Sequence, residues 1–270
     1  MHRLLKILGA AAVVAVFLPA ASASADVCDL TTDGSSCGPI FNGAIFGEVS
    51  PQPTGTGYVD SFLRIQHNGT EQGYNTSARP FQYDQKEPIE YTHDIQLKDI
   101  PIVTIDGVEY REFYLDINEA NSDGKELLSL DELRIYLSPT GEVSGYNPKS
   151  KKLDGLSAIY DMDGGLPKGQ DNWIVLNYSL NSGSGSGDMV AYIPNSLFSG
   201  SSEQYVYLYS KFGLQSGMEA DDGSDAGFEE WWLKEADPGD DVTVPEPATL
   251  LLFGAALGFG VGRRWLNRER

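Results

Sequence analysis

Lysine and arginine are scarce in this 270-residue chain, which has 19 of them against 39 aspartates and glutamates, a formal net charge of -20. The imbalance is larger in the segment 26–244, where 13 basic residues stand against 37 acidic ones. Nucleic acids and anionic lipid headgroups are bound mainly through lysine and arginine, so this composition excludes nucleic-acid binding. The acidic excess favours solubility and attracts divalent cations.

Cysteine and histidine are also rare, with two and three residues in the whole chain. Cys28 and Cys37 are too far apart for a CxxC redox motif, and clustered histidines that could complete a zinc site are lacking. In an oxidising compartment we expect these two cysteines to form a disulfide. His67 and His93 have no sequence context that suggests a Ser-His-Asp site, and we predict that the protein is not an enzyme.

The N-terminus has the three regions of a secretory signal peptide. Basic residues (His2, Arg3 and Lys6) precede the apolar run 7–20, and the small residues 21–25 (ASASA) follow it. This pattern predicts a signal peptide over residues 1–25, cleaved after Ala23 or Ala25.

The C-terminus carries a second apolar segment with charged flanks. Pro245, Glu246 and Pro247 precede the apolar run 248–262, and Arg263 and Arg264 follow it, with two more arginines before the end. A helix of 15 residues is about 22 Å long, which is short for a bilayer core of about 30 Å. Cationic residues beside an apolar segment resist translocation, so the C-terminus is expected in the cytoplasm and the body of the chain outside the inner membrane.

This order of features resembles the PEP-CTERM family of Gram-negative bacteria, whose C-terminal signal consists of a PEP motif, an apolar helix and an arginine cluster. The resemblance covers about a tenth of the chain. It implies recognition by an exosortase, an integral-membrane cysteine protease, with cleavage near Pro245 to Pro247. It also implies transient anchoring in the inner membrane through the helix, and delivery to the cell surface or an exopolysaccharide matrix. The alternative is a plain anchor helix preceded by a chance PEP triplet.

Strand patterns dominate the segment between the two termini. Residues 89–97 alternate between apolar and polar, and the apolar runs 100–105 and 108–117 are joined by Asp106-Gly107, a dipeptide that suits a tight hairpin. Further strands are predicted at 41–49, 58–66, 133–137, 156–161, 173–180, 189–193, 204–212 and 228–233, and one short helix at 127–133. We therefore predict an all-β fold, an antiparallel β-sandwich or jelly-roll-like single domain over residues 26–234.

Two polar segments bear on the domain organisation. Residues 181–188 (NSGSGSGD) are expected to form a loop within the domain, with an interdomain linker as the alternative. Residues 235–244 (EADPGDDVTV) are expected to be a flexible tether before the sorting signal, residues 245–270.

Two acidic, glycine-containing segments are candidate calcium sites, because calcium takes six to eight oxygen ligands from a loop that can turn sharply. The first candidate set surrounds Gly124 and consists of Asp116, Asn118, Glu119, Asn121, Asp123 and either Asp131 or Glu132. The second consists of Asp161, Asp163 and Asp171, with two glycines between them. The first segment departs from an EF-hand loop because Leu130 occupies the position of the bidentate acid. The alternative for both segments is a solvated turn between strands.

Aromatic residues suggest a weaker possibility of glycan binding. Tyr205, Tyr207 and Tyr209 alternate along one strand, and Trp231 and Trp232 are adjacent, so they point to opposite faces of an extended chain. One of the two tryptophans is thus a candidate for an exposed surface that stacks on sugar rings. The alternative is that these side chains fill the core.

Taken together, these features predict an exported, non-catalytic structural or adhesive component of the cell surface or of an exopolysaccharide or biofilm matrix. It would bind polysaccharide or matrix proteins and be stabilised by Ca²⁺. The competing hypothesis is a secreted glycoside hydrolase, because that chemistry needs only two carboxylates at the right separation.

Overall fold

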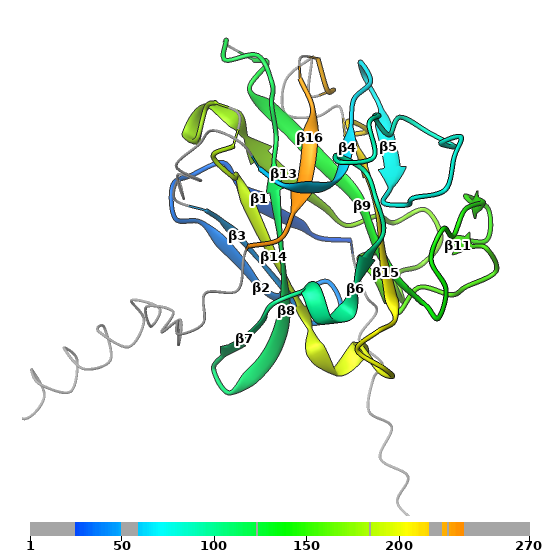
Figure 1. The fold of residues 1–270 in the computed structure, drawn as a ribbon. Helices are drawn as coiled ribbons and strands as arrows, with labels where there is room; N and C mark the ends of the chain where they lie inside the picture. The colour runs from blue at the N-terminus through cyan, green and yellow to red at the C-terminus, as the bar shows by residue number, and fades with distance from the viewer. Residues whose placement is uncertain are drawn as a thin grey trace, which may run out of the picture.

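The computed structural model describes residues 25–49, 59–122, 124–183, 185–215, 223–225 and 227–234, which form two β-sheets (Figure 1). Sheet I runs in the order β1 (Val27–Leu30), β13 (Trp173–Asn177), β9 (Leu127–Ser138), β15 (Tyr205–Phe212) and β5 (Glu71–Tyr74). In addition, β12 (Tyr160–Asp161) pairs with β9, and β6 (Ile95–Gln96) pairs with β15.

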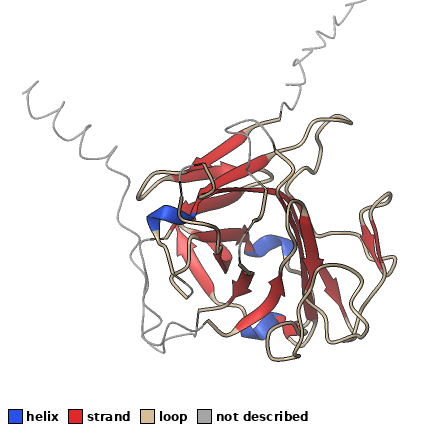
Figure 2. Cartoon of the chain, turned by 90° about the horizontal axis from the view of Figure 1, so that it is seen from above, coloured by secondary structure: helices blue, strands red, loops and turns tan. Residues whose placement is uncertain are grey.

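Sheet II runs in the order β2 (Ser36–Ile40), β3 (Ala44–Glu48), β14 (Met189–Pro194), β8 (Val108–Asp116), β16 (Glu229–Trp232) and β4 (Ser61–Ile65), and β7 (Ile102–Ile105) pairs with β8. A separate hairpin, β10 (Tyr146–Asn147) and β11 (Lys152–Leu153), lies at the side of the molecule (Figure 1). The described helices are three 3₁₀ turns, η1 (Leu97–Asp99), η2 (Tyr178–Leu180) and η3 (Asn195–Leu197), and strand predominates in Figure 2. The structure is therefore the all-β, sandwich-like fold that the sequence predicts.

The main hydrophobic core lies between the two sheets. Sheet II supplies Phe46, Phe113 and Trp231, and sheet I supplies Leu130 and Ile135, all of them fully buried. Every strand pair within the two sheets is antiparallel except β1 with β13, which is parallel. Since both sheets and their shared core form within residues 25–234, this part of the chain contains the interactions that define the fold.

The helix predicted at residues 127–133 is wrong, because these residues begin β9, the longest strand of sheet I. Nearly all of β9 is buried on both faces: Leu130 and Leu133 join the core between the sheets, and Tyr136 joins a tyrosine-rich cluster on the opposite face. A strand buried on both faces loses the alternating pattern that identifies strands in a sequence.

The Asp106-Gly107 hairpin is confirmed, with φ of 49° and 78° at its two central residues. The long strand predicted at 89–97 is reduced to β6 at Ile95–Gln96. Pro88 directly precedes these residues, and its carbonyl accepts a hydrogen bond from Tyr91 N at 3.0 Å, so residues 89–91 form a turn. An alternating pattern does not by itself make a strand, because a strand also needs a neighbouring strand to pair with.

Residues 181–183 and 185–188 lie in a loop inside the folded unit, as expected. Sheet I contains β13 before this loop and β15 after it, and sheet II contains β8 before it and β14 after it. Among the described residues, no helix has the length and apolar character that crossing a membrane requires.

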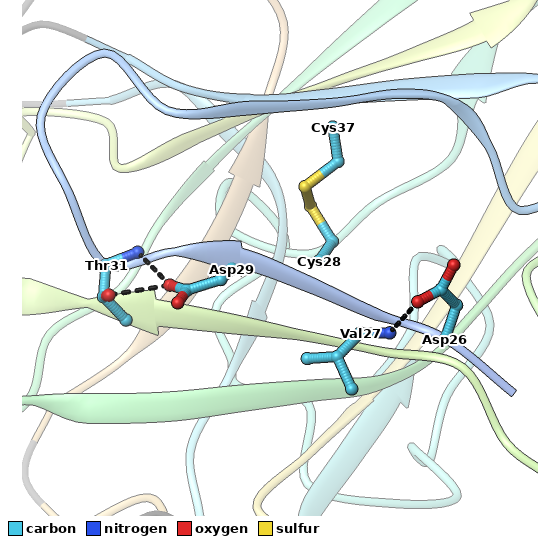
Figure 3. The surroundings of a disulfide bond; sticks show 6 residues. All are labelled: Asp26, Val27, Cys28, Asp29, Thr31 and Cys37. Carbon is cyan, nitrogen blue, oxygen red and sulfur yellow. Dashed lines mark hydrogen bonds between the residues drawn. A yellow bond between two sulfur atoms is a disulfide. The ribbon is translucent and has the colours of Figure 1, made fainter.

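The disulfide between Cys28 and Cys37 connects the two sheets at one edge of the sandwich (Figure 3). Cys28 lies on β1 of sheet I, and Cys37 lies on β2 of sheet II. The turn that follows β1 is held by Asp29, whose Oδ1 accepts hydrogen bonds from Thr31 N at 2.9 Å and Thr31 Oγ1 at 2.7 Å (Figure 3). Although residues 34–38 (GSSCG) have the spacing of a GxSxG motif, they form this turn and β2, without the strand–turn–helix context of a nucleophile elbow.

Candidate functional site

The structure distributes the expected calcium ligands over three separate places. Asp116 lies under the loop 181–188, Glu119 lies in a cluster of glutamates, and Glu132 lies beside Arg134 with Asp161 and Asp163. Asp123 is outside the described residues. The first candidate set therefore does not converge on one loop. In the second set, Asp161 and Asp163 are paired with Arg134, whereas Asp171 is exposed.

Arg134, on β9, is fully buried and surrounded by carboxylates. Its Nε lies 3.1 Å from Asp161 Oδ1, its Nη2 lies 3.3 Å from Asp163 Oδ2, and its Nη1 contacts Glu132. Nη1 also donates a hydrogen bond to Tyr146 Oη at 3.0 Å. Desolvation raises the pKa of Asp163 to about 6, and the positive charge of Arg134 opposes that rise. These carboxylates already have a buried cation as their partner.

Asp116 is held at the end of β8 by backbone donors of the glycine-rich loop. Its Oδ2 accepts a hydrogen bond from Gly185 N at 2.8 Å, and desolvation raises its pKa to about 6 in spite of this bond. Asp188, at the other end of the loop, accepts one from Ile117 N at 2.7 Å. Burial raises the pKa of Asp188, and the nearby Asp116 raises it further. The backbone N–H groups of the loop thus stabilise Asp116, whereas the carboxylate of Asp188 is stabilised by Ile117 N, just after the end of β8.

A second acidic group, here called the glutamate cluster, consists of Glu71 on β5, Glu119 after β8, Glu229 on β16, and Asp225. Glu71 and Glu229 are fully buried, and Glu119 is 3% exposed. The carboxyl groups of Glu71 and Glu229 are close enough for one to donate a proton to the other, as are those of Glu119 and Asp225. Burial is the main cause that raises the pKa of all three glutamates. The negative charge of Glu71 raises the pKa of Glu119 and Glu229 further. At Glu71 itself the charge that adds to burial is that of Asp84, and the hydrogen bond with Glu229 opposes the rise.

The expected glycan-binding surface is wrong at both tryptophans. Trp231 is fully buried and donates a hydrogen bond from Nε1 to Ser210 Oγ at 3.0 Å. Trp232, on the opposite face of β16, is 8% exposed and stacks on Tyr114 with ring centroids 4.7 Å apart. The two rings do point to opposite faces, but other side chains cover both.

The tyrosines of β15 are mostly buried as well. Tyr207 and Tyr209 belong to a cluster on the outer face of sheet I, where Tyr209 stacks on Tyr146 of β10 at 4.2 Å. Tyr205, by contrast, is only half-buried. The small hairpin β10–β11 therefore covers much of the face that the alternation of β15 would otherwise expose.

Tyr205 lines an open, polar hollow of about 540 Å³ together with Ser77, Asp94, Gly141 and Glu142. Asp94 is fixed there by two backbone donors, Ser77 N at 2.9 Å and Glu142 N at 2.7 Å. These residues come from four separate stretches of the chain, so no local motif could have identified them. A Cβ atom on Gly141 would lie 2.8 Å from Asp94 Oδ2 and 3.2 Å from the Tyr205 ring.

Within the described ranges, no three Asp, Glu, His or Cys side chains already have the arrangement of a metal centre. The sorting residues Pro245, Glu246, Pro247, Arg263 and Arg264 lie outside the described residues, as do the signal peptide up to residue 24 and the tether.

Comparison with known proteins gives one finding. Residues 243–264 match the family model of the PEP-CTERM protein-sorting motif, which confirms the resemblance in the sequence of this segment. No match was found among curated proteins or among solved structures. The motif indicates an exported protein that an exosortase processes.

Proposed function

We propose that this exosortase substrate is a non-catalytic structural or adhesive component of the cell surface or of an exopolysaccharide matrix. The observation that carries the proposal is the sorting motif at residues 243–264, which follows a β-sandwich whose sheets are joined by a disulfide. A protein delivered by this route works outside the cell, where a rigid, acidic, disulfide-linked domain suits a lasting structural role.

The hollow around Tyr205 is the surface that we assign to polysaccharide. The half-buried Tyr205 ring offers an apolar face for the C–H groups of a sugar, and the carboxylates of Asp94 and Glu142 accept hydrogen bonds from its hydroxyl groups. The two backbone hydrogen bonds to Asp94 hold its carboxylate in place before a ligand arrives.

Retention on exopolysaccharide tests this assignment. The protein comprising residues 26–244 should be retained on a matrix of purified exopolysaccharide without releasing product. Tyr205→Ala and Gly141→Ala should each weaken retention about tenfold or more, whereas Tyr192→Ala, on sheet II, should leave it unchanged. Equal retention of all four proteins would exclude the hollow as the binding surface.

A secreted glycoside hydrolase is the second candidate, favoured by the presence of Asp94 and Glu142 in the same hollow. This hypothesis predicts release of reducing sugar, abolished by Asp94→Asn and by Glu142→Gln. Release of product by the native protein, lost in both variants, would replace the non-catalytic proposal.

A further inference from the structure

The glutamate cluster contains buried carboxylate oxygens that no donor satisfies. Among the described residues, neither oxygen of Glu229 accepts a hydrogen bond from an amide, a hydroxyl or a cationic group, and the same is true of Glu71 Oε1, Glu119 Oε1 and Asp225 Oδ1. The contact between the carboxyl groups of Glu71 and Glu229 is a hydrogen bond only when one of them is protonated. The backbone N–H of Asn118 interacts with Glu229 and lowers its pKa, but it does not reach hydrogen-bonding geometry. A fully buried Glu229 with two unsatisfied oxygens is the most costly of these groups, because transfer of a carboxylate out of water is strongly unfavourable.

The remaining oxygens of the cluster are firmly held by protein donors. Glu71 Oε2 accepts from His67 N at 2.8 Å, and Glu119 Oε2 accepts from Asp225 N at 2.9 Å. Asp225 Oδ2 lies 2.8 Å from Lys125 Nζ, on a lysine side chain that is 46% exposed. These contacts hold one oxygen of Glu71, Glu119 and Asp225, and they leave the other oxygen of each for a different partner.

The charges in the cluster do not balance. Four carboxylates converge from β5, β16, the segment after β8 and the segment 223–225, and Lys125 is the cation that contacts them among the described residues. Ionised together, the four carboxylates and one ammonium carry a net charge of about -3 in a buried volume. Either protons or a metal cation must offset this charge.

We propose that the glutamate cluster binds a divalent cation, Ca²⁺, through the free oxygens of Glu71, Glu119, Asp225 and Glu229. Carboxylate oxygens without nitrogen or sulfur are the ligand set of a hard cation. Calcium suits irregular coordination by several carboxylates, whereas magnesium requires near-ideal octahedral geometry and usually keeps several waters. Sites of modest affinity are sufficient outside the cell, where extracellular modules bind calcium with Kd values of about 10⁻⁴ to 10⁻³ M.

Cation binding requires these side chains to rearrange, because no three of them among the described residues stand in metal-ligand spacing. The close pairing of Glu71 with Glu229 is a contact that a shared proton stabilises, and cation binding would replace that proton. The inference depends on the export of the protein and does not depend on its binding polysaccharide.

Thermal unfolding of the protein comprising residues 26–244 tests the site. The protein is first dialysed against EDTA at pH 7.5, and CaCl₂ is then added to 1 mM free Ca²⁺ at constant ionic strength. For a Kd near 10⁻⁴ M the Tm should rise by about 3–6 °C, and for a Kd near 10⁻³ M by about 1–2 °C. The same concentration of MgCl₂ should give a much smaller rise.

Glu229→Gln is the diagnostic variant, because it removes the least satisfied carboxylate and nearly preserves its shape. Its Tm in EDTA should equal or exceed that of the native protein, since a buried negative charge is removed, and the rise with Ca²⁺ should be lost. Glu71→Gln is a second variant with the same expectation. Glu90→Gln, on an exposed loop, is the matched control and should keep the full rise.

The titration of the native protein decides the proposal even if both variants fail to fold. A Tm that is the same in EDTA and in 1 mM Ca²⁺ would overturn it and would show that protons neutralise the cluster. An equal rise in the native and Glu229→Gln proteins would also overturn it, because calcium would then bind elsewhere.

Discussion

Replacement of Arg134 by methionine should destabilise the protein strongly. The side chain of Arg134 is fully buried, and its removal leaves Glu132, Asp161 and Asp163 without their shared cation. The carboxylates of Glu132 and Asp161 are each 23% exposed and can be hydrated, but that of Asp163 is only 3% exposed. Asp163 keeps one weaker partner, Lys151, whose Nζ lies 3.7 Å from Asp163 Oδ2 on a side chain that is 43% exposed. The loss should therefore lie toward the lower end of the about 3–5 kcal/mol that breaking a buried ion pair costs.

This loss can be measured by urea and thermal denaturation of the protein comprising residues 26–244. At about 2–4 °C for each kcal/mol in a domain of this size, the Tm should fall by about 6–20 °C. Lys98→Met is the matched control, because it breaks an exposed ion pair with Glu203 that water and salt screen, so its effect on stability should be small.

The second variant Asp163→Asn isolates the charge effect. Combined with Arg134→Met it should recover part of the lost stability, since the amide removes the unpaired charge. If the free energies of unfolding of the Arg134→Met and Lys98→Met proteins differ by less than about 1 kcal/mol, the reasoning about the buried charge is refuted.

Three further predictions follow from the described contacts. The double variant Cys28→Ala, Cys37→Ala should lose about 3 kcal/mol of stability, because the disulfide closes a loop of about 10 residues. An unchanged Tm would contradict this prediction. In EDTA, the urea midpoint should fall as the pH rises from 5 to 8. Burial raises the pKa of Asp131 to about 7 and that of Asp163 to about 6, whereas the same groups release their protons near pH 4 in the unfolded chain. Between these pH values the folded protein binds more protons than the unfolded chain, so its stability falls as the pH rises. A midpoint that rises with pH would count against this assignment. Trp231→Phe should be more destabilising than Trp232→Phe by about 1–2 kcal/mol. Loss of the Trp231 indole leaves Ser210 Oγ without its donor, whereas Trp232 Nε1 has no acceptor among the described residues. Equal losses of stability in the two variants would refute this explanation.

The sequence predicts the strands of the sandwich well where a strand has one buried and one exposed face or a recognisable turn. The Asp106-Gly107 hairpin is the best case, because its two residues tolerate positive φ and the runs beside it pair directly. Strand β9 was mistaken for a helix at its start because its residues are buried on both faces. The parallel pairing of β1 with β13 joins residues that are far apart in sequence, and no local pattern specifies such a pair.

The candidate sites were harder to predict, because their residues meet only in three dimensions. Glu119 was selected as part of a continuous calcium loop, but its neighbours in space are Glu71 and Glu229, which lie on different strands. Counting acidic residues along the chain cannot show which carboxylates face an arginine, as Asp163 does, and which face one another. The sorting motif was easier, because its recognition depends on a linear order of residues.

The mass of the protein recovered from its native host tests the central claim most directly. If an exosortase processes the chain, intact-mass measurement should show a protein that begins near Asp26 and ends near Pro245 to Pro247, without the apolar run 248–262. Recovery of a protein that still carries Arg270 would contradict processing at the sorting motif.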